Sequence, residues 1–182
     1  MALPGMGGRL AISGSRPHIA SSEARMTRNC PDSASPLRLI AFDSEDLEVL
    51  SAHLQDAIVR VGDMGWLPEQ DRFVLGLSRF DWLAAESGQC ERAVCALRFE
   101  RVRTVRQNGV PQREPERALS LLSIGFTQTE APAGRIELTF SGGAALRLDV
   151  ECLEAHLRDL GPRWTARSRP GHALDAGPAQ GS

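Results

Sequence analysis

The chain has 182 residues, of which 42% are hydrophobic and 24% are charged, and its formal net charge is −2. This length and apolar content suit one globular domain, and no apolar run approaches the roughly 20 residues that a membrane-spanning helix needs. All 21 of the residues counted as Lys or Arg are arginines, and no aromatic residue lies between Arg101 and Arg106. With an acidic balance overall, this pattern argues against nucleic acid as a partner. The short apolar runs argue against a membrane.

The two ends of the chain differ in composition from its middle. Residues 1–36 contain Gly-Gly and several X-Pro steps without apolar periodicity, and residues 169–182 have the same character. Such composition is typical of solvated, disordered segments. We therefore expect a disordered N-terminal extension at 1–36, a single domain at 37–168 and a disordered tail at 169–182. Either Met1 or Met26 can be the true start, and the lack of a signal-like apolar stretch predicts a cytoplasmic protein.

The domain is predicted to begin with a strand and a helix. Residues 37–42 form a short run that is compatible with a buried strand. Asp43 can cap a helix, because its carboxylate reaches a free backbone N–H two or three residues further on. The apolar residues that follow recur at helical spacing: Leu47, Leu50, Leu54 and Ile58. A helix is therefore predicted from Asp43 to about Asp56.

Strand patterns fill the middle of the chain. The sequence alternates in AIVRVG, MGWL, RFVLGLSRFDW, RAVCALRF, RVRTVR and LSLLSIGF, with turn or loop signals at PEQD, AAESGQ and Asn108-Gly109. A β-hairpin is predicted next, with strands 136–140 and 146–150 joined by a turn at 141–144. Its Gly142-Gly143 pair connects two strands, which favours a turn over a phosphate-binding loop.

The segment after the hairpin has the pattern of a second helix. Asp149 can cap it and Gly161-Pro162 can end it, while Leu153, Leu157, Leu160 and Trp164 repeat at intervals of four, three and four. Short connections favour an antiparallel sheet, because parallel strands need long crossovers. The predicted fold class is α+β: an antiparallel, strongly bent sheet or partly open barrel, pleckstrin-homology-like by analogy, with one N-terminal and one C-terminal amphipathic helix. A flatter helix-on-sheet sandwich is the alternative.

Charge is distributed unevenly along the domain. Residues 37–91 contain four Arg and eleven acidic residues, whereas residues 92–117 contain seven Arg and three Glu. Within the basic stretch, a regular strand places Arg101 and Arg103 on one face, where they can grip phosphate or carboxylate. The predicted binding surface combines these arginines with an acidic helix face: Arg101, Arg103, Arg106, Glu45, Glu48 and His53. Its expected ligand is a protein partner or a second copy of the chain, with a small anion as an alternative.

A catalytic or metal site is a second hypothesis. Cys152 and His156 are four residues apart on a predicted helix, the geometry of two metal ligands. Two ligands are half a site, and the candidates for the others are His53, Cys90 and Cys95. A packed Cys beside a rim His is the simpler interpretation. Ser51 and His53 cannot join in a triad, because residues two apart on a helix point to nearly opposite sides. No cofactor and no catalytic residue is predicted.

Three blocks of the sequence, taken together, resemble a known family. They are LRLIAFDSEDLEVLSAHLQDAIVRVGD, RFVLGLSRFDW and IELTFSGGAALRLDVECLEAHLRDLGPRW. This resemblance is to a bacterial domain of unknown function, DUF2948, over about residues 37–172. The family brings no activity, cofactor or catalytic residue to these positions. The leading hypothesis is therefore a soluble, non-enzymatic accessory module that binds a protein partner or itself, and the alternatives are a small metal-assisted or hydrolytic enzyme and an anion sensor.

Overall fold

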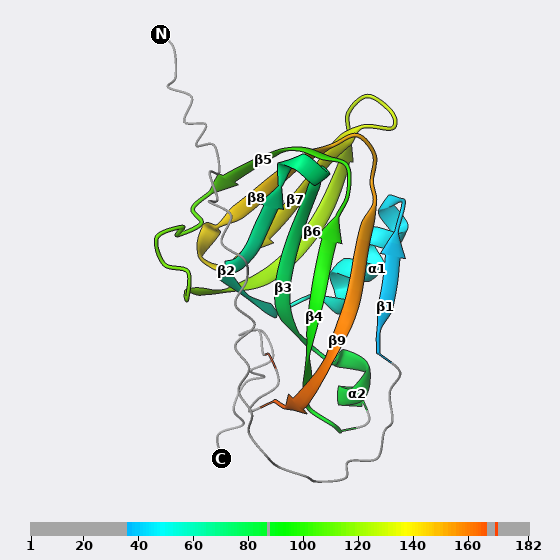
Figure 1. The fold of residues 1–182 in the computed structure, drawn as a ribbon. Coiled ribbons are helices and arrows are strands. Elements are labelled where there is room, and N and C mark those ends of the chain that lie inside the picture. Colours follow the sequence, from blue (N-terminus) through cyan, green and yellow to red (C-terminus); the bar gives the residue numbers. More distant parts are fainter. Residues whose placement is uncertain (1–35, 87, 167–169, 171–182) are drawn as a thin grey trace, which may run out of the picture.

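The computed structural model describes residues 36–86, 88–166 and 170, and Figure 1 shows their fold. Two helices lie in this part of the chain, α1 (Ser44–His53) and α2 (Trp82–Glu86). The strands are β1 (Arg38–Ala41), β2 (Ala57–Leu67), β3 (Arg72–Phe80), β4 (Glu91–Phe99), β5 (Val102–Asn108), β6 (Ala118–Gln128), β7 (Gly134–Phe140), β8 (Ala145–Val150) and β9 (Ala155–Thr165). The predicted antiparallel sheet is confirmed.

All nine strands belong to one open sheet, in the order β1-β9-β4-β3-β2-β6-β7-β8-β5. Strand β2 pairs with both β3 and β6, and its pairing with β3 shifts register between Val59 and Met64. A register shift of this kind bends a strand and increases its twist. The sheet therefore curves at β2, so that β1, β9, β4 and β3 lie across from β6, β7, β8 and β5 (Figure 1).

The core fills the inner face of this curved sheet. Its largest buried side chains include three phenylalanines, Phe73, Phe99 and Phe140. Alternation with a period of two is evident in β4, where residues 93, 95, 97 and 99 are buried and their neighbours are not. Because successive side chains in a strand point to opposite faces, the same alternation leaves the outer face of the sheet accessible.

Helix α1 covers the opening of the curved sheet, in contact with β1 on one side and β6 on the other (Figure 1). It forms where the sequence predicts a helix, and the Asp43 carboxylate accepts a hydrogen bond from the Asp46 amide at 2.8 Å. Leu47, Leu50 and Leu54 are buried beneath it. The helix ends at His53, three residues before the predicted end, because the backbone turns at Leu54 and Asp56 into β2.

The predicted hairpin is present, with β7 and β8 joined by a short 3-10 turn at Ser141–Gly143. Gly142 and Gly143 both have positive φ, which suits glycine in a tight turn. The Asn108-Gly109 step behaves differently from its prediction as a tight turn. Strand β5 pairs with β8 rather than with β6, so residues 109–117 form a connection across the sheet instead of a hairpin loop.

The prediction of a C-terminal helix is wrong, because residues 155–165 form strand β9 between β1 and β4. The buried positions alternate through Leu153, Ala155, Leu157 and Asp159. Ala155 is small and Asp159 is charged, so neither stands out as apolar in the sequence and the remaining leucines imitate helical spacing. The analogy with the pleckstrin-homology fold depended on a C-terminal helix that fills the open end of the sheet, and this segment is strand β9 instead.

The predicted disordered segments at 1–36 and 169–182 lie almost entirely outside the described residues. In the described part of the chain, no helix has the length and apolar character needed to cross a membrane.

Candidate anion-binding site

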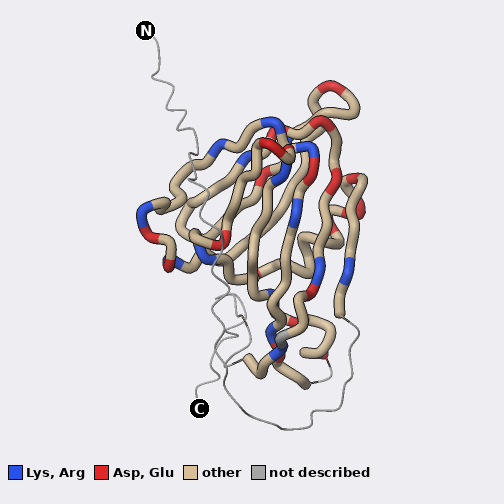
Figure 2. Tube along the Cα trace, in the orientation of Figure 1, with Lys and Arg blue, Asp and Glu red and all other residues tan. Residues whose placement is uncertain are grey.

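Basic side chains gather on the outer face of β1, β9 and β4. Antiparallel pairing sets Arg38 of β1 directly opposite Arg158 of β9, which in turn lies opposite Ala96 of β4. In the next row of the sheet, His156 lies between Ile40 and Arg98. Figure 2 shows basic positions on each of these three strands. Three neighbouring strands thus present four basic side chains, Arg38, Arg98, His156 and Arg158, over an area about 10 Å wide.

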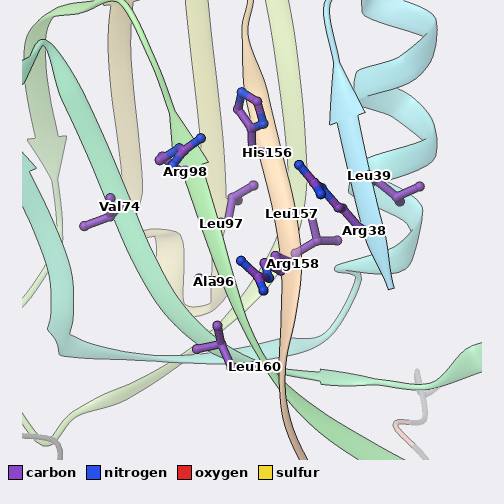
Figure 3. Close-up of a pocket in the computed structure, with 10 residues that line it drawn as sticks. All are labelled: Arg38, Leu39, Val74, Ala96, Leu97, Arg98, His156, Leu157, Arg158 and Leu160. Atoms are coloured by element: carbon purple, nitrogen blue, oxygen red, sulfur yellow. The ribbon is translucent and has the colours of Figure 1, made fainter. Parts of the chain in front are cut away.

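A shallow cavity of about 280 Å³ lies over this part of the sheet. Figure 3 shows Arg98 and His156 at one end, Arg158 beside Ala96 in the middle, and Leu160 at the other end. The cavity exists because Ala96 is small and leaves space between its larger neighbours. Its full lining is Arg38, Leu39, Val74, Ala96, Leu97, Arg98, His156, Leu157, Arg158 and Leu160.

Acidic residues neutralise only one end of this group. Glu100 lies 2.7 Å from Nε of Arg98, but the same carboxylate receives two hydrogen bonds from Arg72. Nε of Arg98 has no hydrogen-bond partner in the described residues, so its contact with Glu100 is one of charge alone. His156 lies 3.1 Å from the Glu154 carboxylate. Among the described residues, no carboxylate forms an ion pair with Arg38 or Arg158.

Two like charges placed directly opposite each other destabilise a sheet. Arginine at the edge of a sheet commonly serves another purpose, since charge there prevents edge-to-edge association. That purpose explains Arg38, because β1 is an edge strand. It does not explain Arg158, because β9 is not an edge strand and pairs with β1 on one side and β4 on the other. The position of Arg158 therefore favours a role in binding negative charge.

Arg158→Gln is expected to raise the free energy of unfolding by about 0.2–0.5 kcal/mol at low ionic strength, because it removes repulsion from Arg38. The gain should vanish in 1 M salt, where the Debye length falls to roughly 3 Å. Urea denaturation at both salt concentrations measures this effect. Arg60→Gln is the control, since Arg60 has an ion-pair partner in Glu116 at 3.5 Å. A lower free energy of unfolding in Arg158→Gln would show that repulsion between Arg38 and Arg158 does not destabilise the sheet.

The arginines predicted from the sequence lie elsewhere, on and beside edge strand β5. Arg103 contacts the carboxylates of Asp71, at 3.1 Å, and Glu151. Arg106 lies 3.9 Å from Asp149. Arg101 is exposed in the β4–β5 turn with positive φ. Two of these three charges are therefore already matched by carboxylates, which leaves them less available to an anion than Arg38 and Arg158.

The predicted combination of these arginines with the acidic helix face is not one surface. Strand β5 is at one edge of the sheet, whereas α1, which carries Glu45, Glu48 and His53, contacts β1 at the other edge and β6 (Figure 1). His53 is partly buried near the inner-face residues Arg79, Asp81 and Asp159. Burial, reinforced by the positive charge of Arg79, lowers the pKa of His53 against the opposing effect of the two carboxylates.

The inner face near His53 holds a buried ion-pair network. Arg79 donates two hydrogen bonds to Asp159, at 2.9 and 2.8 Å, and Arg163 donates to Asp159 at 3.2 Å and to Asp81 at 2.8 Å. The Leu37 amide donates to Asp159 at 3.0 Å. Every oxygen of Asp159 is thus occupied by this chain's own donors, so the network ties β1, β3 and β9 together.

The metal hypothesis loses its geometric basis. Cys152 lies in the turn before β9 and His156 lies on β9, so they are not on one helix. Across the described residues, no group of three or more His, Cys, Asp or Glu side chains is arranged to hold a metal ion. Cys95 is buried beside the Arg79–Asp159 pair, and burial raises the pKa of its thiol to about 12. That thiol is a poor nucleophile, because reactivity requires the thiolate.

Sequence reasoning missed Arg38 and Arg158 as site residues and gave His156 a different role. The cause is the helical prediction for 149–161, which separates Arg158 from its neighbours in the sheet. With β9 as a strand, His156 and Arg158 share a face, since side chains two apart in a strand point the same way. The useful signal is the alternation of basic residues at 156 and 158 with buried residues at 155, 157 and 159.

The fold and site together define an α+β domain built on a single open antiparallel sheet, with a basic cavity on its outer face. Residues 37–172 match the family described as "Protein of unknown function (DUF2948)". The chain therefore belongs to the DUF2948 family, as its sequence blocks suggest. No curated protein matches the chain, and no solved structure matches it either.

Proposed function

We propose that this chain is a non-enzymatic binding domain whose ligand carries a phosphate or carboxylate group. The observation that supports the proposal is the pairing of Arg38 with Arg158, which places side by side, next to a cavity, two cations that form no ion pair with any described residue. A bound anion would turn this unfavourable repulsion into attraction. Arginine suits the task, because its planar guanidinium can donate two parallel hydrogen bonds to phosphate or carboxylate.

The proposal revises the anion-sensing function expected from the sequence by moving it from β5 to the outer face of β1, β9 and β4. It keeps the working unit at residues 37–168 and the cytoplasmic location and bacterial origin expected from the sequence. The cavity of about 280 Å³ lies at or below the small end of ligand sites, which generally span roughly 300–1,000 Å³. A small organic anion therefore fits better than a large cofactor.

Titration calorimetry with inorganic phosphate tests this function. Wild-type protein should bind, and Arg158→Gln should weaken binding at least tenfold, because one charge-assisted hydrogen bond contributes about 1.5–3 kcal/mol. The matched control is Arg106→Gln, which removes an equal charge from β5 and should change affinity less than twofold. Loss of binding in Arg106→Gln but not in Arg158→Gln would refute the proposed site and favour the β5 arginines.

Association with a protein partner or a second copy is a second candidate function. Two large apolar side chains, Leu83 on α2 and Trp164 on β9, are 62% and 43% exposed. Exposed apolar residues of this size can mark protein contacts when they form a continuous patch. Light scattering across a range of protein concentrations separates the possibilities, because self-association requires a mass that rises with concentration.

A further inference from the structure

We propose that the ligand is amphipathic, with an anionic head group joined to a short apolar chain. This inference rests on the proposed anion-binding function and adds the chemical class of the ligand. It depends on the composition of the cavity wall, on the order of the residues along it and on the exposure of Leu160.

The cavity wall contains only two kinds of side chain. The lining side chains on the outer face are basic, in Arg38, Arg98, His156 and Arg158, or aliphatic, in Val74, Ala96 and Leu160, and none has a hydroxyl, amide or carboxylate group. The other three lining residues, Leu39, Leu97 and Leu157, have side chains that pack into the core. The polar groups of a sugar or a nucleobase would therefore meet few matching partners there, and an unpaired polar group that loses its water costs free energy. A ligand made of one anionic group and a short hydrocarbon chain matches these two kinds of side chain.

The basic and aliphatic side chains follow a spatial order from one end of the cavity to the other. Figure 3 shows Arg98 and His156 at one end and Leu160 at the other, with Ala96 and Arg158 between them. Across β4 and β3, the row that contains Arg158 continues through Ala96 to Gly76, where the Asp63 side chain lies over the glycine and ends the open row. This order gives an anionic head a position among the arginines and leaves the apolar side chains of Ala96 and Leu160 beside it.

Leu160 supplies the apolar end of the cavity. Its side chain is 55% exposed although it lines the cavity wall. The pairing of β9 with β4 shifts register between residues 93 and 95 of β4, opposite the stretch of β9 that contains Leu160. The adjacent Gly161 has a φ of +110°, so the strand is bent at this point. An alkyl chain lying against Leu160 would cover apolar surface that now faces water.

The test is a calorimetric series on the full chain with inorganic phosphate and with ethyl, butyl and hexyl phosphate. Affinity should rise about twofold per added methylene, because full burial of a methylene gives about fourfold and an open cavity covers only part of it. Hexyl phosphate should therefore bind roughly 15-fold more tightly than ethyl phosphate. Glucose 6-phosphate should bind no more tightly than inorganic phosphate.

Leu160→Ser should abolish the dependence on chain length and leave the affinity for inorganic phosphate within twofold. Leu83→Ser is the matched control, since Leu83 is 62% exposed on α2 and does not line the cavity. This control should show the same rise in affinity with alkyl chain length as the wild-type protein. Thermal unfolding of both variants shows whether they are folded.

The outcomes separate this inference from the proposed function. If phosphate binds but chain length has no effect, the amphipathic ligand is wrong and anion binding stands. If neither phosphate nor any alkyl phosphate binds, both are wrong. Vesicles containing phosphatidic acid present the same head group and chain in a membrane. If the protein binds these vesicles but not hexyl phosphate, the inference of a small amphipathic ligand is wrong and the site recognises a lipid surface.

Discussion

Asp159→Asn is expected to lower the free energy of unfolding by about 3–5 kcal/mol, the cost of breaking a buried ion pair from one side. Asp159 and Arg79 are 5% and 3% exposed. The substitution keeps the shape of the side chain but removes its charge. Arg79 would then remain buried beside Asp81 at 3.7 Å as its principal counterion, and Arg163 and the Leu37 amide would lose a charged acceptor.

The effect of pH on this contribution follows from the pKa of Asp159. Burial raises the pKa of Asp159. Hydrogen bonds from Arg79 and the Leu37 amide, together with attraction to Arg79 and Arg163, lower this pKa by more than burial raises it, so the net shift is downward. A carboxyl group with a lowered folded-state pKa stabilises the fold above its unfolded-state pKa and loses that contribution as pH falls through the folded-state value. The difference between wild type and Asp159→Asn should therefore shrink in acid.

Chemical denaturation between neutral pH and pH 3 measures both effects. Glu137→Gln is the control, because Glu137 pairs with Arg147 at 3.4 Å on the exposed face and its side chain is 44% exposed. An exposed pair contributes about 0–1 kcal/mol. Equal destabilisation by the two substitutions, or a constant difference across the acid range, would show that the buried network does not hold β1, β3 and β9 together.

Leu50→Ala is expected to destabilise the fold by about 2–5 kcal/mol, the range for truncating a buried leucine. Leu50 is 1% exposed, on the face of α1 that packs against the inner side of the sheet. Because α1 contacts both β1 and β6, a void beneath it weakens contacts to two parts of the curved sheet.

Val49→Ala, at the neighbouring position, is the matched control. Val49 is 54% exposed, and alanine has the higher helix propensity, so this variant should change stability by less than about 0.5 kcal/mol. Urea denaturation of the two variants provides the comparison. Similar losses from both would mean that α1 does not cover the core through its Leu47/Leu50/Leu54 face.

The parts of the fold that could be predicted are those with clean local signals. Asp43 and the leucines after it specify α1, and the period-two pattern on either side of Gly142-Gly143 specifies the β7–β8 hairpin. The failure at β9 has a physical origin, because Asp159 occupies a core position through its pairing with Arg79. A charged residue there interrupts the alternation that identifies a strand, and sequence alone does not reveal the partner 80 residues away.

The candidate site could be predicted only in part for the same reason. Arg38, Arg98 and Arg158 come from three segments that are separated in sequence and meet only through the β1–β9–β4 pairing. The stretch 98–106 attracts attention because four arginines lie close together in the sequence, yet pairing with Asp71, Glu151 and Asp149 neutralises Arg103 and Arg106. Local density of charge indicates a basic surface, whereas the balance of charge in three dimensions indicates where an anion can bind.

The most direct measurement of the central claim is an NMR titration of the full chain with inorganic phosphate, which locates the bound anion. The largest amide shifts should fall at Arg38, Ala96, Arg98 and Arg158, on three neighbouring strands. Shifts confined to Arg101–Arg106 on the opposite edge of the sheet, or no shifts at all, would contradict an anion site on the outer face of β1, β9 and β4.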